Sequence, residues 1–518
     1  MFSGAIDGYV LGSFVVYLAA MLLIGFLFSG KVSTLGDYYL GGRKMNKWVV
    51  ALSAQASDMS GWLLMGLPGA VFAAGFCEAW IGLGLGIGTY LNWKIVAHRL
   101  RVYSHICGDS ITIPDFIANR FRDRTGVART VAALIILIFF TFYTASGFVS
   151  CAKLFSSTFN MDARWALWIG AAVVVSYTLL GGFMAVCWTD FIQGALRFAA
   201  SVLVPAIVIG NAGGFAEAVD QLNGISPYLQ NLFTDARTGR ACGFIGLMSS
   251  VAWGLGYFGM PHILVRFMSI DNPAEVKGSR RIAMTWVFIS LGAAVMIGLV
   301  GHLFLKQRGM TLAQFGDDPE KIFIIMVNGL FNTGVCARIL AGILLSAILA
   351  AIMSTADSQL LVSASAFSND LYKVLFRKRA SDRERVRVSR LAVAAVALAA
   401  ALLASNDKGD FFKVVMKLVS FAWGGFGAAF GPLILLSLFW KRVNLAGAVA
   451  GMVTGAATCF VWKFILAERF AAAHPIFGLY ELAPGFLFAM LVTVIVSLVT
   501  PAPSREILDE FEAAGRTV

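Results

Sequence analysis

The chain has 518 residues, of which 58% are hydrophobic and only 14% are charged, and its formal net charge is +12. Soluble domains carry about a quarter charged residues, so this composition excludes a string of soluble domains and indicates one integral membrane unit. The basic residues cluster in short loops between apolar runs, as the positive-inside rule requires, so the net charge implies no nucleic-acid partner.

Apolar runs of about 20 residues, long enough to cross a lipid bilayer as helices, follow one another along the whole chain. About 13 spans can be placed, so we predict an all-α integral membrane protein. The first run, 9–28, has no basic residue before it, which argues for a first span and against a signal peptide. Basic loops at 43–47, 99–124 and 277–281 then place the N-terminus outside and the C-terminus in the cytoplasm.

The second run contains SAQASDMSGWLLMGLPG, residues 53–69, in which a charge interrupts an otherwise apolar segment. Asp58 costs at least a few kcal/mol at membrane depth, and Gly61, Gly66 and Pro68 weaken the helix that follows it. Broken backbone is tolerated in lipid only where it is buried in protein or lines a wet cavity. The alternative is that the glycines merely allow close helix packing.

The seventh run contains VAWGLGYFGMPHI, residues 251–263, and is also interrupted by glycines and a proline. Two interrupted spans at corresponding positions of two halves are the best indication in a sequence of a transporter binding site. The seventh run comes five spans after the second, and because five is odd their orientations are opposite. We expect 48–211 and 242–439 to form an inverted repeat, with 9–28, 445–466 and 479–500 as peripheral helices in one transmembrane domain.

A third candidate element is the run Ile343–Leu361, which carries small and hydroxyl residues within an apolar helix. Ala351, Ser354 and Thr355 fall at i, i+3 and i+4 and share one helical face. Hydroxyl oxygens together with a freed carbonyl suit a hard cation. The pattern is weak by itself, because Ser and Thr often bond back to their own helix.

Enzyme and metalloprotein classes are disfavoured by the motifs. The sequence has no HExxH, GxSxG or Walker A pattern, and its seven cysteines show no metal-ligand spacing. We therefore expect a non-enzyme. The short tail SREILDEFEAAGRTV leaves no room for a signalling kinase, which disfavours a receptor.

Five segments resemble the solute:sodium symporter family, and in particular its proline-transporting branch. They are LGGR at 40–43, ASDMSGWLLMGLPGAVF at 56–72, FFTFYTASG at 139–147, WGLGYFGMPHILVRFM at 253–268 and RVNLAGAVAGMVTG at 442–455. The resemblance implies a leucine-transporter-like five-plus-five inverted-repeat core with extra helices. It also implies sodium-driven uptake of L-proline by alternating access across the bacterial cytoplasmic (inner) membrane, with no obligate protein partner.

The resemblance also implies which residues form the sites. Sodium would be held by the carbonyls of Ala56, Met59 and Ala351 and the hydroxyls of Ser354 and Thr355, with Asp58 required nearby. Proline would lie between the two broken helices, at Ser60, Gly61, Trp62, Tyr143, Trp253, Tyr257 and Pro261. For each aromatic residue, ordinary packing is the alternative.

Two further predictions concern charges. Arg43 matches a residue tied to coupling and inner gating, although a positive-inside role also explains it. Asp357 stands where a small neutral residue is expected in this branch, and together with Asp190 and Ser358 it would form a second cation site. For Asp190, a charge at the start of a helix is the alternative. The transported solute also stays open, because relatives carry sugars, sialic acid, pantothenate or iodide, and a membrane sensor of proline is a further alternative.

Overall fold

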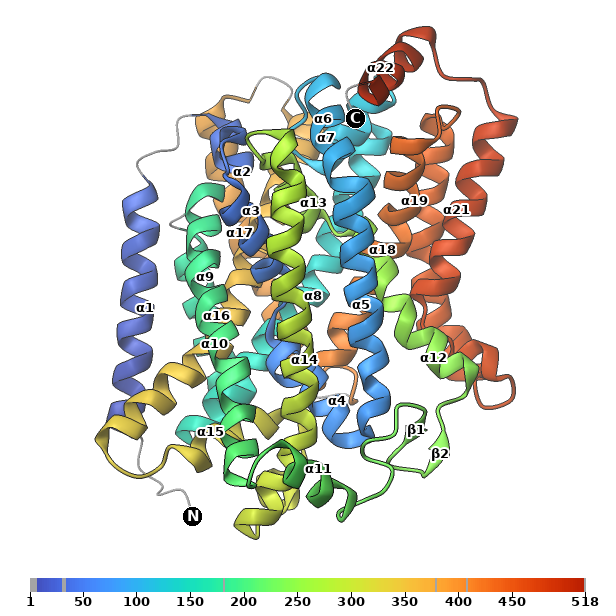
Figure 1. Cartoon of the computed structure of the whole chain (residues 1–518). Helices are drawn as coiled ribbons and strands as arrows, with labels where there is room; N and C mark the ends of the chain where they lie inside the picture. Colours follow the sequence, from blue (N-terminus) through green and yellow to red (C-terminus); the bar gives the residue numbers. More distant parts are fainter. Residues whose placement is uncertain (1–6, 30–33, 180–181, 378–379, 407–408, 517–518) are drawn as a thin grey trace.

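The apolar runs form helices that stand side by side in one bundle in this computed structural model (Figure 1). It describes residues 7–29, 34–179, 182–377, 380–406 and 409–516. The helices of the first half are α1 (Gly8–Ser29), α2 (Leu35–Leu40), α3 (Lys47–Asp58), α4 (Leu67–Ala74), α5 (Ala79–Leu91), α6 (Ala97–Ile106), α7 (Ile113–Arg120), α8 (Val127–Phe159), α9 (Ala163–Thr178), α10 (Phe183–Asn211) and α11 (Phe215–Asn223).

The second half begins after a short antiparallel hairpin of β1 (Thr234–Asp235) and β2 (Arg240–Ala241). Its helices are α12 (Gly243–Ala252), α13 (Pro261–Ser269), α14 (Val276–Arg308), α15 (Ile322–Leu330), α16 (Val335–Ser365), α17 (Asp382–Ala404), α18 (Val415–Phe439), α19 (Leu445–Val461), α20 (Glu468–Phe470), α21 (Leu482–Val499) and α22 (Arg505–Arg516).

The number of membrane spans is lower than expected when it is judged by helix length. Within the described residues, nine helices are long and apolar enough to cross a membrane, and a tenth span joins Gly243–Gly259 to Pro261–Ser269 through a bend of 47°. The predicted all-α membrane architecture is confirmed, but the count of 13 is not. One reason is that the span with Asp58 is divided into α3 and a shorter apolar helix, Trp62–Ala74.

Both expected breaks are present, and local sequence explains each. The carboxamide of Asn46 caps the start of α3 by accepting from the backbone N–H groups of Trp48 and Val49. The helix ends at Asp58, because Met59 leaves the helical region with φ −81° and ψ 78°. In the other span, Pro261 is the first residue of α13, where its missing N–H costs nothing.

The helices of the two halves contact one another in matching pairs. Helix α3 packs against α10, and the corresponding segment η5 (Trp253–Gly259), a 3₁₀ helix between α12 and α13, packs against α18. The contact between α8 and α18 corresponds to the contact between α16 and α10. In the same way, the contact of α14 with α3 and α4 corresponds to the contact of α5 with η5. These three contacts of the first half therefore have counterparts in the second.

Candidate functional site

Asp58 lies where the two broken spans meet, and it is completely buried. Its Oδ2 atom accepts a hydrogen bond of 2.6 Å from the hydroxyl of Tyr257, in the middle of the other broken span. Its backbone carbonyl accepts from the hydroxyl of Tyr143 on α8 at 3.2 Å and from Nε1 of Trp62 at 3.1 Å. Three of the predicted substrate residues therefore bond to Asp58, one to its carboxylate and two to its backbone carbonyl.

Glycines permit this convergence by letting neighbouring groups come close to the backbone. A Cβ atom on Gly256 would overlap the indole of Trp423, and one on Gly61 would lie 2.6 Å from the Oγ atom of Ser150. The indole of Trp423 donates to the carbonyl of Trp253 at 2.7 Å and meets the ring of Tyr257 edge-on, with ring centroids 4.9 Å apart. The glycines are needed for the geometry of the site as well as for packing.

Among the described residues, Trp253 has no hydrogen bond to Asp58 and is linked to Tyr257 through Trp423. Its ring stacks on Tyr480, with centroids 5.3 Å apart, and thus lies in an aromatic group with Trp423. Pro261 begins α13 beyond the break.

All seven predicted substrate residues are buried: Ser60, Gly61, Trp62, Tyr143, Trp253, Tyr257 and Pro261. The region between the broken helices is therefore closed to solvent in this conformation.

The predicted sodium ligands on α3 and α16 are neighbours. The hydroxyl of Ser354 lies 2.8 Å from the carbonyl oxygen of Ala56 and 3.2 Å from that of Ala351. Thr355 is buried, and its Oγ1 atom has no hydrogen-bond partner among the described residues. The guanidinium of Arg197, on α10, donates to the carbonyls of Ala56 and Met59. Among the oxygens expected to hold sodium, those of Ala56, Ala351 and Ser354 are thus close together, and the carbonyls of Ala56 and Met59 already contact a cation.

The predicted second cation set is also brought together, around another arginine. Nη2 of Arg266 lies 2.9 Å from Oδ2 of Asp190 and 2.6 Å from Oγ of Ser358. Ser358 in turn lies 3.3 Å from Oδ1 of Asp357. Ser53 donates to Asp190 at 2.7 Å. Asp190 is therefore a buried, ion-paired group inside α10, not a solvated charge at the start of that helix.

Arg43, in the segment before α3, makes hydrogen bonds to α13 and to the segment after α6 at one end of the bundle. Its guanidinium donates to the carbonyl of Met268 in α13 at 2.7 Å, to the carbonyl of Ser110 at 2.8 Å and to Asp109 at 2.9 Å. Partial burial opposes ionisation of Asp109, but hydrogen bonds from His105 and Arg43 outweigh it and hold the pKa of Asp109 below its ordinary value. Arg43 thus links the loop before α3 to the far end of the second broken span.

Sequence reasoning missed Arg197, Arg266 and Trp423. Both arginines interrupt apolar runs, in GALRFAA and ILVRFMS, and an intramembrane charge is a functional hypothesis by default. Arg197 and Arg266 fit this rule as well as Asp58 does. Trp423 gives no local signal, because its role depends on a contact with Gly256, 167 positions earlier in the chain.

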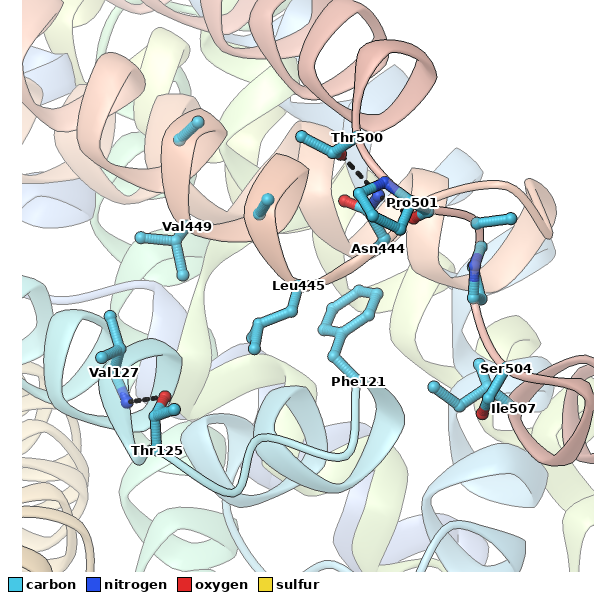
Figure 2. A pocket seen from close by; sticks show the side chains of 14 residues that line it. Phe121, Thr125, Val127, Asn444, Leu445, Val449, Thr500, Pro501, Ser504 and Ile507 are labelled. Carbon is cyan, nitrogen blue, oxygen red and sulfur yellow. Dashed lines mark hydrogen bonds between the residues drawn. The ribbon is translucent and has the colours of Figure 1, made fainter.

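One pocket lies apart from these residues, beside the segment that leads into α22. Figure 2 shows Phe121, Leu445, Pro501 and Ile507 along its walls, and its volume is about 660 Å³. Asn444 donates to Thr500 at 2.7 Å and so ties the end of α21 to the start of α19. None of the predicted site residues lines this pocket, so it has no part in the site around Asp58.

A family comparison decides the assignment. Residues 38–455, which include both broken spans and all the residues described around Asp58, match the Sodium:solute symporter family. The chain belongs to this family. The family consists of symporters, so the expectation of a non-enzyme is confirmed, and its membership together with the apolar helices makes the chain a multi-pass membrane transporter.

Curated relatives match over nearly the whole length. The High-affinity proline transporter PutP of Bacillus subtilis is 49% identical over 491 residues, which are 95% of this chain and 98% of the relative. The Osmoregulated proline transporter OpuE of the same organism is 46% identical, over 95% of this chain and 94% of its own. The Sodium/proline symporter of Escherichia coli is 45% identical over 98% of this chain and 97% of its own.

Solved structures agree on the fold. A Na+-coupled sialic acid symporter in a substrate-bound outward-open state has a TM-score of 0.76 at 19% identity, over 96% of this chain and 99% of that one. Mhp1, a nucleobase-cation-symport-1 family transporter, in a closed conformation has a TM-score of 0.53 at 13% identity, over 92% of this chain and 98% of that one. The expected leucine-transporter-like fold class is confirmed.

Proposed function

We propose that this chain couples inward movement of sodium to uptake of L-proline by alternating access. The observation that carries the proposal is the hydrogen bond of 2.6 Å from Tyr257 to Asp58, which joins the two broken spans at a buried carboxylate. Relatives named as proline transporters or sodium/proline symporters, 43–49% identical over most of the chain, support both the solute and the ion.

Proline suits the groups at this junction. Its carboxylate is favoured near the N-terminal end of a broken half-helix, where unpaired N–H groups carry partial positive charge. Its apolar ring and cationic amine suit aromatic faces, which Trp62, Tyr143 and Tyr257 supply around Asp58. Trp253 and Tyr480 form the neighbouring aromatic group, which we assign to the outer side of the solute site.

Sodium would bind between the end of α3 and the face of α16. We assign it to the carbonyls of Ala56, Met59 and Ala351 and the hydroxyls of Ser354 and Thr355. Oxygen ligands from carbonyls and hydroxyls suit a hard cation, and the short Ser354–Ala56 contact supports this placement. Asp58 supplies the negative field close by. Asp190, Asp357 and Ser358 form a candidate second site, at present paired with Arg266.

Alternating access follows if the two halves are inverted repeats. We infer that 48–211 and 242–439 are these repeats, with 9–28, 445–466 and 479–500 outside them. The matching pairs of helix contacts in the two halves support the inference. Because contacts recur in matching pairs, and inverted repeats have opposite orientations, exchange of one set of contacts for the other can open either end of the site.

We place the protein in the cytoplasmic membrane of a bacterium, with its N-terminus outside and its C-terminus inside. In Figure 1, α2, α6, α7 and α22 lie at one end of the bundle, whereas α1 begins at the other end, where α11 and the β1–β2 hairpin also lie. The first end carries a group of basic residues, as the positive-inside rule requires of a cytoplasmic face: Arg43, Arg99, Arg101, Arg120 and Arg122.

The test is uptake of labelled L-proline into proteoliposomes with and without an inward sodium gradient. We expect accumulation only with the gradient, and competition by unlabelled proline. Sodium-driven uptake of another small solute, with no effect of proline, would reassign the substrate. Binding of proline without transport would favour a membrane sensor.

A further inference from the structure

Arg197 is a buried cation that neither proposed binding set includes. It lies on α10 with 1% of its surface exposed. Its Nη1 atom donates to the carbonyl of Ala56 at 3.2 Å and to the carbonyl of Met59, and its Nη2 atom lies 3.4 Å from the carbonyl oxygen of Gln55. These three carbonyls close the C-terminal end of α3, where the helix dipole places partial negative charge.

Two of these oxygens are the ones assigned to sodium. An arginine side chain stays protonated in proteins, so a full positive charge already rests on the α3 half of the proposed sodium site. A sodium ion at the same oxygens would stand beside a like charge in a buried environment, which is strongly unfavourable. Sodium and the guanidinium in this position therefore exclude each other.

We propose that Arg197 is a tethered cation that occupies the carbonyls of Ala56 and Met59 when sodium is absent and leaves them when sodium enters. This inference rests on the proposed sodium site. The guanidinium adds a charged donor to these carbonyls in the empty transporter. When it leaves, the carbonyl of Ala56 keeps the hydroxyl of Ser354 and that of Gln55 keeps the backbone N–H of Met59. Sodium must displace the guanidinium to bind, so Arg197 sets how much sodium the transporter needs.

Two buried carboxylate oxygens are candidate acceptors for the displaced guanidinium. Asp58 and Asp190 are the two carboxylates that interact electrostatically with Arg197. In each, the Oδ1 atom is buried and has no hydrogen-bond partner within the described part of the chain. A rotation of the Arg197 side chain toward either oxygen exchanges carbonyl contacts for a charge-assisted one. Sodium entry is thereby linked to the charge state around Asp58.

Arg266 shows why Arg197, and not every buried arginine, has this role. Arg266 forms an ion pair of 2.9 Å with Asp190 and a further hydrogen bond to Ser358. Its hydrogen bonds thus include a charge-assisted one to a carboxylate. Within the described ranges of the chain, the hydrogen bonds of Arg197 go only to neutral backbone carbonyls. Of these two buried guanidinium groups in α10 and α13, Arg197 is the one that a metal cation can replace.

The test is equilibrium binding of radioactive sodium to the purified protein without proline. We expect Arg197→Met to lower the half-saturating sodium concentration by about tenfold, the scale of a typical coupling between two ligands. Arg197→Lys, which keeps the charge, should stay near the wild type. The matched control is Arg120→Met, which removes an equally buried guanidinium that lies over the rings of Tyr103 and Phe511; it should leave sodium binding unchanged.

A second variant and a structure complete the test. If Arg197→Met does not fold, Arg197→Gln removes the charge but keeps a donor, and the same tighter binding is expected. Wild-type sodium binding in a folded Met or Gln variant overturns the inference. So does a structure at saturating sodium in which the guanidinium still contacts Ala56 and Met59. If the wild type shows no sodium-driven proline uptake, the proposed function is wrong. Tighter sodium binding in the Arg197 variants would still support this inference.

Discussion

The two carboxylate oxygens of Asp58 have different surroundings. Oδ2 accepts the hydroxyl of Tyr257 at 2.6 Å, whereas Oδ1 is buried without a hydrogen-bond partner among the residues described. A buried carboxylate oxygen without a partner costs free energy unless a cation is close. Asp58 therefore has one oxygen fixed to the second broken span and one available to a cation that moves in the site.

Asp58→Asn should raise the half-saturating sodium concentration for proline uptake by about tenfold or more, since the loss of only ~1.4 kcal/mol of attraction is a factor of ten. The amide has nearly the same shape, so the protein should still fold and insert. Sodium dependence is measured by labelled-proline uptake in proteoliposomes. Tyr257→Phe removes the hydroxyl but not the charge and should change sodium dependence much less. A wild-type sodium response in Asp58→Asn would contradict the role given to the carboxylate.

Thr355→Ala should weaken sodium binding without removing a proline contact. Because linkage between two ligands is reciprocal, proline affinity should fall at low sodium and recover substantially when sodium is saturating. Proline binding is measured across a sodium titration. The matched control is Ser346→Ala on the same helix, whose hydroxyl bonds back to the carbonyl of Gly342 at 2.7 Å. Poor proline affinity at every sodium concentration would place Thr355 in the solute site or the fold.

At the scale of elements, the broken spans were predictable and the groups that hold them were not. Glycine, proline and an aspartate in an apolar run predict a break, because each weakens a helix or costs free energy in lipid. No local sequence pattern predicts that Trp423 packs against the second break, because its indole comes from another span and contacts Gly256. Arg197 carried a signal, a charge within α10, but its carbonyl partners on α3 lie 138 to 142 positions away.

Gly256→Ala should destabilise the second broken span. A Cβ atom there would overlap the indole of Trp423, and an extra methyl group in a well-packed region costs about 1–3 kcal/mol. We expect a lower thermal midpoint in detergent and weaker proline binding, since Trp423 also contacts Tyr257. The control is Gly246→Ala in α12, whose Cβ atom would meet nothing within 4 Å. If the two variants behaved alike, close approach at Gly256 would not matter.

At the scale of the whole molecule, Arg43 connects segments that are far apart in the sequence at one end of the bundle. Arg43 joins the loop before α3 to α13 and to the segment after α6. Asp109 is 64% exposed in its side chain, so that ion pair by itself contributes little. The part-buried hydrogen bonds from Arg43 to the carbonyls of Met268 and Ser110 contribute more to the connection between these segments.

Arg43→Met should open this end more often. Spin labels at Lys44→Cys and Asn272→Cys, in a background without reactive native cysteines, should show a longer and broader distance distribution by electron resonance. The control is Lys47→Met, which removes only an exposed ion pair of 3.7 Å with Glu275 and should leave the distribution unchanged. An unchanged distribution in Arg43→Met would leave Arg43 with a positive-inside role alone.

The pairing of α10 with α3 has a consequence for how the chain is made. Helix α10 must enter the membrane carrying both Asp190 and Arg197, and each charge at the centre of a span costs about 2.5–3.5 kcal/mol during insertion. Polar partners for both already exist on α3, where Ser53 binds Asp190 and carbonyls bind Arg197. Since α3 leaves the ribosome before α10, it can shield these charges on arrival, well before Arg266 is synthesised. The α3 groups to which we assign cation exchange thus also supply polar partners for the charges of α10 during insertion.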